Sequence, residues 1–426
     1  MKRLLALILS ILMVFSLVAC GAKDVEEGGG IGISGGIINK VESALDGGEM
    51  VDAEMAAPMA PGGTPSEILP GGDEEIQFPQ YSAGTLTAGE WKDAENLDFW
   101  TKLLNRNDWY ELMENRNLFT NHVVPVKVID QEGYACFNAD VYLLDEQNNE
   151  LYHAVSDAHG NAYLLYNLNK DENEKPVSVK VGDATYPVNF DGITEAKLND
   201  FTVEINYLDL MLMIDTTGSM SDELTYLQTE LENVIETIAE DNQVLSIRLS
   251  VNFYRDESDD YVIKAYDFTD DIEKAVTQLN AQRTDGGGDY PEAVHKALAN
   301  IIDDHDWRNN AVKLCFFVLD APPHSEQEIR DINTKMQKSI EKMSANGVRL
   351  IPVASSGVDT ETEFLLRSWS LMTGGTYTFL TNHSGVGNDH LEPTIGDYEV
   401  EKLNDLMVRI IREYCGAITI NIPDGQ

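Results

Sequence analysis

The oxygen-bearing side chains best suited to chemistry in this sequence gather in three short segments. These are residues 215–221 (Asp-Thr-Thr-Gly-Ser-Met-Ser), 285–292 (Asp-Gly-Gly-Gly-Asp-Tyr-Pro-Glu) and 320–322 (Asp-Ala-Pro). They supply carboxylates and hydroxyls without imidazole or thiolate, and such hard donors suit Mg²⁺, Ca²⁺ or Mn²⁺ rather than zinc or copper. The glycines would let the backbone approach an ion closely. We therefore predict one divalent-cation site built from the three segments.

The elements that must position these segments are predicted from the apolar pattern around them. Residues 208–214 and 312–319 are continuous apolar runs, typical of strands buried on both faces, and the first and third segments follow them directly. The second segment opens a helical stripe at 293–302. Ligands of open α/β sheets sit beyond the carboxyl ends of the strands, so we expect all three segments at that edge.

The region from about 206 to 416 alternates between predicted strands and predicted helices, and it ends in an amphipathic helix. This order predicts an α/β domain with a doubly wound, mainly parallel sheet. Within it, the spacing Asp215-x-Thr217-x-Ser219 places one carboxylate and two hydroxyls on one side of a tight turn.

This spacing resembles the Asp-x-Ser/Thr-x-Ser signature of the von Willebrand factor A family, whose metal-ion-dependent adhesion site combines three such loops. The resemblance covers roughly residues 206–415. It implies that Thr217 and Ser219 give their hydroxyls directly to the metal, while Asp215 and Asp320 act mostly through bound waters. Mg²⁺ is the expected ion, with Ca²⁺ and Mn²⁺ as alternatives.

The second loop offers two candidates for the remaining ligand. Many members of the family contribute a threonine there, and Thr284 is the nearest in this sequence. However, Asp289-x-Pro291-Glu292 is closer to the integrin β-subunit variant, in which the glutamate reaches the metal, so Glu292 is preferred and Thr284 is kept as the alternative.

The function implied by the resemblance is binding of a protein ligand, with an open metal position accepting an acidic side chain of the partner. An envelope scaffold with a purely structural metal is the alternative, and a metal-dependent hydrolase is a third. We expect no enzyme, because the sequence has no recognisable Ser/His/Asp set. Residues 286–288 also lack the Lys-Ser/Thr of a phosphate-binding loop.

Further acidic residues near the three loops could hold a second cation. The candidates are Asp222, Glu223 and Asp289, and solvated acids at a helix N-terminus are the alternative reading. More carboxylates in the same neighbourhood are Asp256, Asp259 and Asp260. His383 and His390, near Asp389, are read as an ordinary surface loop rather than a metal site.

The N-terminus reads as an export signal. Lys2 and Arg3 precede an apolar run at 4–19, which is short for a membrane-spanning helix. The run ends in Leu-Val-Ala-Cys20, which resembles the bacterial lipobox, and the resemblance implies a signal peptide at 1–19 and lipidation of Cys20. The chain is then expected at the extracytoplasmic face of the cell membrane, held by a lipid anchor. The alternative is an ordinary secretory signal with an incidental cysteine.

The remaining segments complete the predicted organisation. Residues 20–89 are interrupted by glycine and proline and read as a flexible tether; 90–120 read as helical. Short strands between turns predict a β-sandwich at 121–205, with its last strand at 201–205. The turn around residues 157–162 (Asp-x-x-Gly-x-Ala) resembles that of carboxypeptidase-regulatory-like, immunoglobulin-like modules, and 417–426 form a terminal strand or tail.

The net charge excludes one class of partner, and the cysteine count limits the disulfides that can be expected. With 30 Lys and Arg against 73 Asp and Glu, the net charge is −43, which repels nucleic acid. Beyond Cys20 there are Cys136, Cys315 and Cys415, an odd number without metal spacing, so no complete disulfide framework is expected.

Overall fold

The computed structural model describes residues 83–199, 204–241 and 245–416. The predicted signal peptide, the lipidation candidate Cys20, nearly all of the predicted tether and the tail at 417–426 lie outside these residues. Within the described ranges, no helix is both long enough and apolar enough to cross a membrane.

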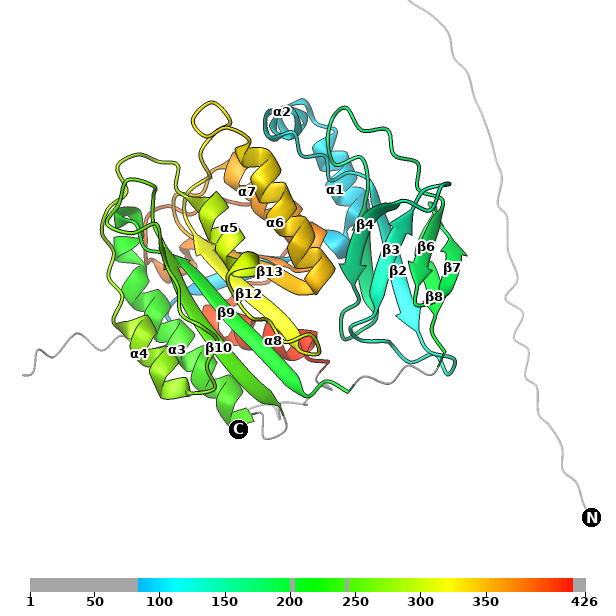
Figure 1. Ribbon diagram of the computed structural model, residues 1–426. Helices are drawn as coiled ribbons and strands as arrows, with labels where there is room; N and C mark the ends of the chain where they lie inside the picture. The colour runs from blue at the N-terminus through cyan, green and yellow to red at the C-terminus, as the bar shows by residue number, and fades with distance from the viewer. Residues whose placement is uncertain (1–82, 200–203, 242–244, 417–426) are drawn as a thin grey trace, which may run out of the picture. The chain divides into compact units, whose positions relative to one another are not determined.

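An eight-stranded sheet forms the centre of the α/β part of the chain (Figure 1). Its five middle strands are parallel, and short antiparallel partners extend it at the sides. In spatial order the strands are β11 (Ile263–Lys264), β10 (Ser246–Tyr254), β9 (Tyr207–Asp215), β12 (Val312–Leu319), β13 (Val348–Ala354), β14 (Tyr377–Leu380), β1 (Thr87–Trp91) and β15 (Glu401–Lys402).

Strands β9 and β12 lie in the middle of this sheet and are buried on both faces. In β9, Leu210 and Leu212 pack into the core on one face, whereas Met211 and Met213 pack into the core on the other. This division follows from the two-residue period of a strand. A continuous apolar sequence is therefore needed, as the sequence analysis inferred.

Helices cover both faces of the sheet (Figure 1). On one face are α3 (Leu224–Asp241), α4 (Ile272–Asn280) and α8 (Leu403–Tyr414). On the other are α5 (Val294–Asp303), α6 (Ile332–Asn346) and α7 (Thr360–Thr373). The prediction of a doubly wound, mainly parallel α/β fold is confirmed.

Strand β1 corrects the predicted boundary between tether and helical segment. Residues 87–89, assigned to the tether, pair antiparallel with β14, and Ala88 lies opposite Leu380. The predicted tether ended at Gly89, yet the sheet requires a glycine at this position, because a Cβ there would lie 2.5 Å from the Phe379 ring. Long-range packing against β14, rather than local propensity, makes this strand.

The helical segment after β1 packs against α7. It consists of the short helix η1 (Asp93–Glu95), α1 (Leu97–Leu104) and α2 (Asn107–Arg116). Trp100 of α1 and Trp109 of α2 lie 6.5 and 6.2 Å from the ring of Phe364. Arg367 of α7 stacks over both tryptophans and donates two hydrogen bonds to Asp93, so a fully buried ion pair fixes this segment.

Two small sheets between α2 and β9 share one core and form a sandwich. One contains β5 (Asn161–Leu165), β2 (Val123–Ile129) and β8 (Thr194–Lys197); the other contains β4 (Glu150–Val155), β3 (Asp140–Leu144), β6 (Ser178–Val181) and β7 (Ala184–Pro187). The architecture agrees with the predicted sandwich, whereas the resemblance to carboxypeptidase-regulatory-like modules stays a prediction.

The last strand of the sandwich differs from the predicted one. It is β8, whose Thr194 and Ala196 are buried while Glu195 and Lys197 face outward. Its sequence has weak strand propensity, which explains why it went unrecognised. Of the predicted strand at 201–205, residues 201–203 lie outside the described residues and 204–205 are not in a strand.

Candidate divalent-cation site

The three predicted loops meet at the carboxyl edge of the sheet. Asp215 ends β9, and Asp320 follows β12, its parallel neighbour. Backbone hydrogen bonds join the second loop to each of the other two. Gly218 N–H donates to the Gly286 carbonyl at 3.1 Å, and Glu292 N–H donates to the Pro322 carbonyl at 3.0 Å. The protein backbone alone therefore brings the candidate ligands together.

The Asp-x-Thr-x-Ser turn is closed by its own side chains. Oδ1 of Asp215 accepts hydrogen bonds from the Thr217 amide at 2.9 Å and from the Thr217 hydroxyl at 2.7 Å. The Thr217 and Ser219 hydroxyl oxygens are 3.1 Å apart. Asp215 and Thr217 are fully buried, whereas Ser219 is exposed. The turn thus carries its donors from the sheet edge out to the surface.

Each of the three predicted carboxylate ligands has one buried oxygen without a hydrogen-bond partner among the described residues. These oxygens are Oδ2 of Asp215, Oε2 of Glu292 and Oδ1 of Asp320. The side chains are almost inaccessible, and Glu292 is only 2% exposed. Buried carboxylate oxygens are costly unless they bind a donor or a cation, so these atoms fit a metal site.

The pKa shifts of these acids point the same way. Burial, followed by the charges of Asp215, Asp256 and Asp320, raises the pKa of Glu292 to about 9. Burial followed by the charge of Asp215 raises the pKa of Asp320 to about 8, and burial raises the pKa of Asp215 to about 6. A nearby cation would remove both the repulsion and the desolvation penalty of the ionised forms.

The donor set fits a hard divalent ion. Asp215, Glu292 and Asp320 supply carboxylate oxygens, and Thr217 and Ser219 supply hydroxyls. No nitrogen or sulfur atom belongs to this set, and such all-oxygen sites favour Mg²⁺, Ca²⁺ or Mn²⁺.

Gly287 explains why the second loop is rich in glycine. Its φ is +70°, and a Cβ there would lie 3.1 Å from Oε1 of Glu292 and 3.2 Å from Cβ of Thr217. The loop therefore passes between two candidate ligands at a distance that only glycine permits without displacement. Asp259 fixes the loop from the other side by accepting the Gly287 amide at 3.0 Å.

Tyr254 is a site residue that the sequence analysis missed. It ends β10 and lies opposite Asp215 in the parallel register. Burial raises its pKa well above the usual range, and the charges of Asp215, Asp320 and Glu292 raise it further, so the phenol lies beside all three acids. The available signal was its position at the end of a predicted strand, next to the strand that carries the motif.

The alternative ligand Thr284 is half-buried in the second loop. Across the described residues its hydroxyl has no hydrogen bond to a candidate ligand. The carboxylate of Glu292, by contrast, has its pKa raised by burial and then by the charges of Asp215 and Asp320, which favours Glu292 as the acid of this loop.

The residues predicted for a second cation have different surroundings from one another. Glu223 is buried, accepts the Ser356 amide at 3.2 Å and faces Nε2 of His390 at 3.1 Å. Asp289 is exposed near His324. The side chain of Asp222 lies outside the described residues. Glu223 and Asp289 thus do not form a single cluster with each other.

The other polar candidates are also accounted for. His383 contacts Thr381, and His390 contacts Asn382 as well as Glu223. Asp389 and Asp260 are exposed. The cysteines at 136, 315 and 415 are free thiols.

Residues 209–348 match the family model described as a von Willebrand factor A domain. This range begins inside β9, ends at the start of β13 and contains all three loops. The chain therefore contains a von Willebrand factor A domain, as the loop signature suggested.

A curated protein described as an ariadne-like RING finger protein, R811 of Acanthamoeba polyphaga mimivirus, is 31% identical over 124 residues. The alignment covers 29% of this chain but only 12% of that protein. The shared part is thus one limited segment, and the name of the whole viral protein assigns no activity to this chain.

Proposed function

We propose that this chain is a lipid-anchored surface protein that binds a protein ligand through a divalent cation, with Mg²⁺ as the expected ion. Asp215, Thr217, Ser219, Glu292 and Asp320 would hold the ion. The observation that carries the proposal is the set of three buried carboxylates, each with an oxygen that has no hydrogen-bond partner among the described residues, on loops that backbone hydrogen bonds join.

Some of the proposed ligands are buried, and one is exposed to solvent. Asp215 and Thr217 lie in the buried part of the turn, while Ser219 is exposed, so the cluster has an accessible side. A bound divalent ion would supply positive charge and an open coordination position for an acidic side chain of the ligand. The uncharged hydroxyls of Thr217 and Ser219 would leave more of that charge uncompensated than carboxylates would.

Glu292 sets a limit on the expected affinity. A direct carboxylate ligand neutralises part of the ion's charge and weakens its attraction for the acid of a partner. The net charge of −43 would also slow the approach of an acidic ligand. We therefore propose capture of moderate affinity that strengthens with ionic strength, because salt screens the long-range repulsion.

The first test measures ion binding and ligand binding together. Mg²⁺ is titrated calorimetrically into the wild-type chain and Asp215→Ala, and both immobilised proteins are used to capture extracellular proteins with and without chelator. We expect Asp215→Ala and the chelator to abolish the same interactions. Capture that survives both treatments would contradict the adhesive role.

An envelope scaffold with a structural metal is the second candidate, favoured by the mutual repulsion of the buried acids. In that case Mg²⁺ would raise the melting temperature, while Asp320→Ala would leave association with the captured partner intact. Loss of association in Asp320→Ala, with the fold retained, supports the ligand-binding role instead.

The anchor is tested separately at Cys20, which lies outside the described residues. Cys20→Ser is expected to abolish incorporation of labelled fatty acid and to release the protein from the membrane fraction. Unchanged labelling and fractionation would argue for an ordinary secretory signal.

A further inference from the structure

His324 lies close to the candidate cation site but has its own set of neighbours. It follows the Asp-Ala-Pro-Pro stretch after β12 and is only 8% exposed. Its Nε2 is 2.7 Å from Oδ1 of Asp256, which is itself buried. Its Nδ1 has no hydrogen-bond partner in the described part of the chain.

The pairing with Asp256 determines which nitrogen is available. A carboxylate accepts a proton, so the contact at Nε2 is made by an Nε2–H that donates to Asp256. The neutral ring then carries its lone pair on Nδ1. A histidine held by a carboxylate through one nitrogen and open at the other is the usual arrangement of a metal-binding imidazole.

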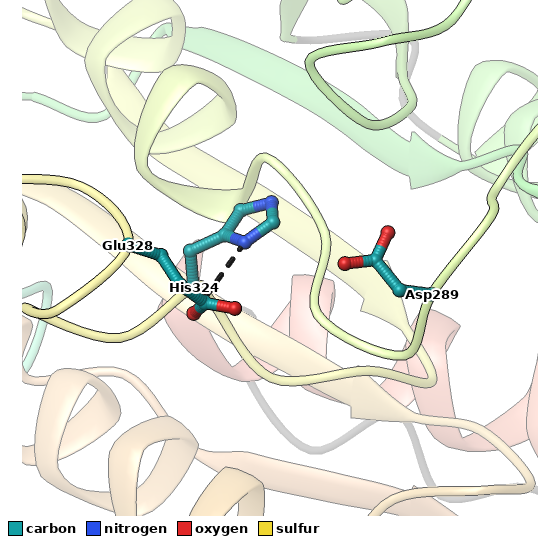
Figure 2. Close-up of side chains that lie close together, drawn as sticks. All are labelled: Asp289, His324 and Glu328. Carbon is teal, nitrogen blue, oxygen red and sulfur yellow. Dashed lines mark ion pairs between the residues drawn. The ribbon is translucent and has the colours of Figure 1, made fainter.

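Nδ1 faces the carboxylate of Glu328, and the carboxylate of Asp289 lies on another side of the same ring (Figure 2); both acids are exposed. Oε2 of Glu328 is 3.7 Å away, and one ligand atom each from His324, Asp289 and Glu328 can be chosen so that all three lie within 4.8 Å of one another. With metal–ligand bonds of about 2.1 Å, tetrahedral geometry separates two ligand atoms by about 3.4 Å. The Nδ1 to Glu328 distance is therefore close to that of two ligands of one ion and too long for a hydrogen bond.

The surrounding structure fixes two of these three groups. Arg116 of α2 is buried and donates to the His324 carbonyl at 2.8 Å and to the Pro323 carbonyl at 3.1 Å. Oε2 of Glu328 accepts both the amide and the hydroxyl of Ser325 at 2.7 Å. The imidazole and one carboxylate are thus positioned before any ion arrives, and only Asp289 must adjust.

We propose that His324, Asp289 and Glu328 bind a second divalent ion of the zinc class, distinct from the hard ion of the three-loop site. One imidazole and two carboxylates leave a fourth position for water or a ligand. Asp256 connects the two sites, because it holds His324 and also lies close enough to Glu292 to raise the pKa of that acid. The second ion would lie beside the surface on which the proposed protein ligand binds.

The test titrates Zn²⁺ into the full chain by calorimetry in the presence of excess Mg²⁺. Wild type should bind one equivalent, and Glu328→Gln and Asp289→Asn should each weaken binding at least about tenfold. Both side chains are exposed, and Glu328→Gln keeps an oxygen that can accept from Ser325, so the metal-free melting temperature should change little. His153→Ala is the matched control, because His153 also pairs with an aspartate, Asp140 at 3.0 Å, but should leave zinc binding unchanged.

A second background separates this proposal from the three-loop site. Asp215→Asn should lose Mg²⁺ binding and keep its equivalent of Zn²⁺, and adding Glu328→Gln to it should remove the zinc as well. If Asp215→Asn alone abolishes zinc binding, the zinc belongs to the three-loop site and the proposal fails. It fails equally if Glu328→Gln and Asp289→Asn bind zinc as wild type does.

Discussion

Replacing Glu292 by glutamine should make the metal-free chain more stable, although it removes a proposed metal ligand. Burial and neighbouring acids raise the pKa of Glu292 from 4.5 to about 9. Between these values the folded chain binds a proton that the unfolded chain has released. The stability contributed by this group is therefore complete below about pH 4.5 and is lost as pH rises toward 9.

The magnitude follows from this interval. At about 1.4 kcal/mol per pH unit, the rise from pH 4.5 to pH 7 costs wild type about 3 kcal/mol in free energy of unfolding. Glutamine has nearly the same shape and no ionisation to suppress, and its amide can donate to the neighbouring carboxylates of Asp215 and Asp320. In chelator at pH 7, Glu292→Gln should therefore be more stable than wild type by up to about 3 kcal/mol.

The assay is chemical denaturation in chelator and in Mg²⁺, repeated from pH 5 to pH 9. The difference between Glu292→Gln and wild type should widen with pH in chelator. Mg²⁺ should stabilise wild type more than the variant and so reduce this difference. Asp285→Asn, which removes a charge from an exposed position of the same loop, is the control and should show neither effect.

Two results would refute this reasoning. One is a variant less stable than wild type in chelator at pH 7, and the other is a difference that does not depend on pH. Either would mean that the Glu292 carboxylate is not held among the acids of the cluster.

Three further predictions follow from individual residues. Gly287→Ala should lower the free energy of unfolding by about 1–2 kcal/mol and weaken Mg²⁺ binding, because the φ of Gly287 is +70°. Gly288→Ala is the control, since a Cβ there has no neighbour within 4 Å, and it should change neither quantity in parallel denaturation and titration experiments. Arg367→Ala should cost about 3–5 kcal/mol in urea denaturation, because it leaves Asp93 buried without its partner. Mg²⁺ at a hundred times its Kd should stabilise wild type by about 2.7 kcal/mol and Asp215→Ala not at all, as read from calorimetric melting.

Much of the α/β part could be predicted from sequence because its signals are local. Strand β12 is apolar throughout since it lies between two layers of helices, and α3 shows an apolar stripe because only one side faces the sheet. The order of strands and helices then places the ends of β9 and β12 at one edge. This is why Asp215 and Asp320 could be grouped from sequence alone.

The elements missed by the sequence analysis owe their structure to distant partners. Strand β1 forms because β14 offers an open edge, and β8 forms because its Thr194 and Ala196 fit beneath the sandwich core. Tyr254 was missed as a neighbour of the candidate ligands for the same reason. A tyrosine at a strand end becomes meaningful only once the strand register places it beside Asp215.

The order in which the site is built has a physical consequence. The loops are joined by backbone hydrogen bonds, such as Asp285 N–H to the Thr216 carbonyl at 3.2 Å, and these do not depend on charge. The fold, supported by the cores on both faces of the sheet, therefore holds Asp215, Glu292 and Asp320 together against their mutual repulsion. Because the cluster is preformed, binding an ion requires little free energy for ordering its ligands. The strength of ion binding should thus depend on the backbone geometry of the loops, and Gly287 should matter as much as a ligand does.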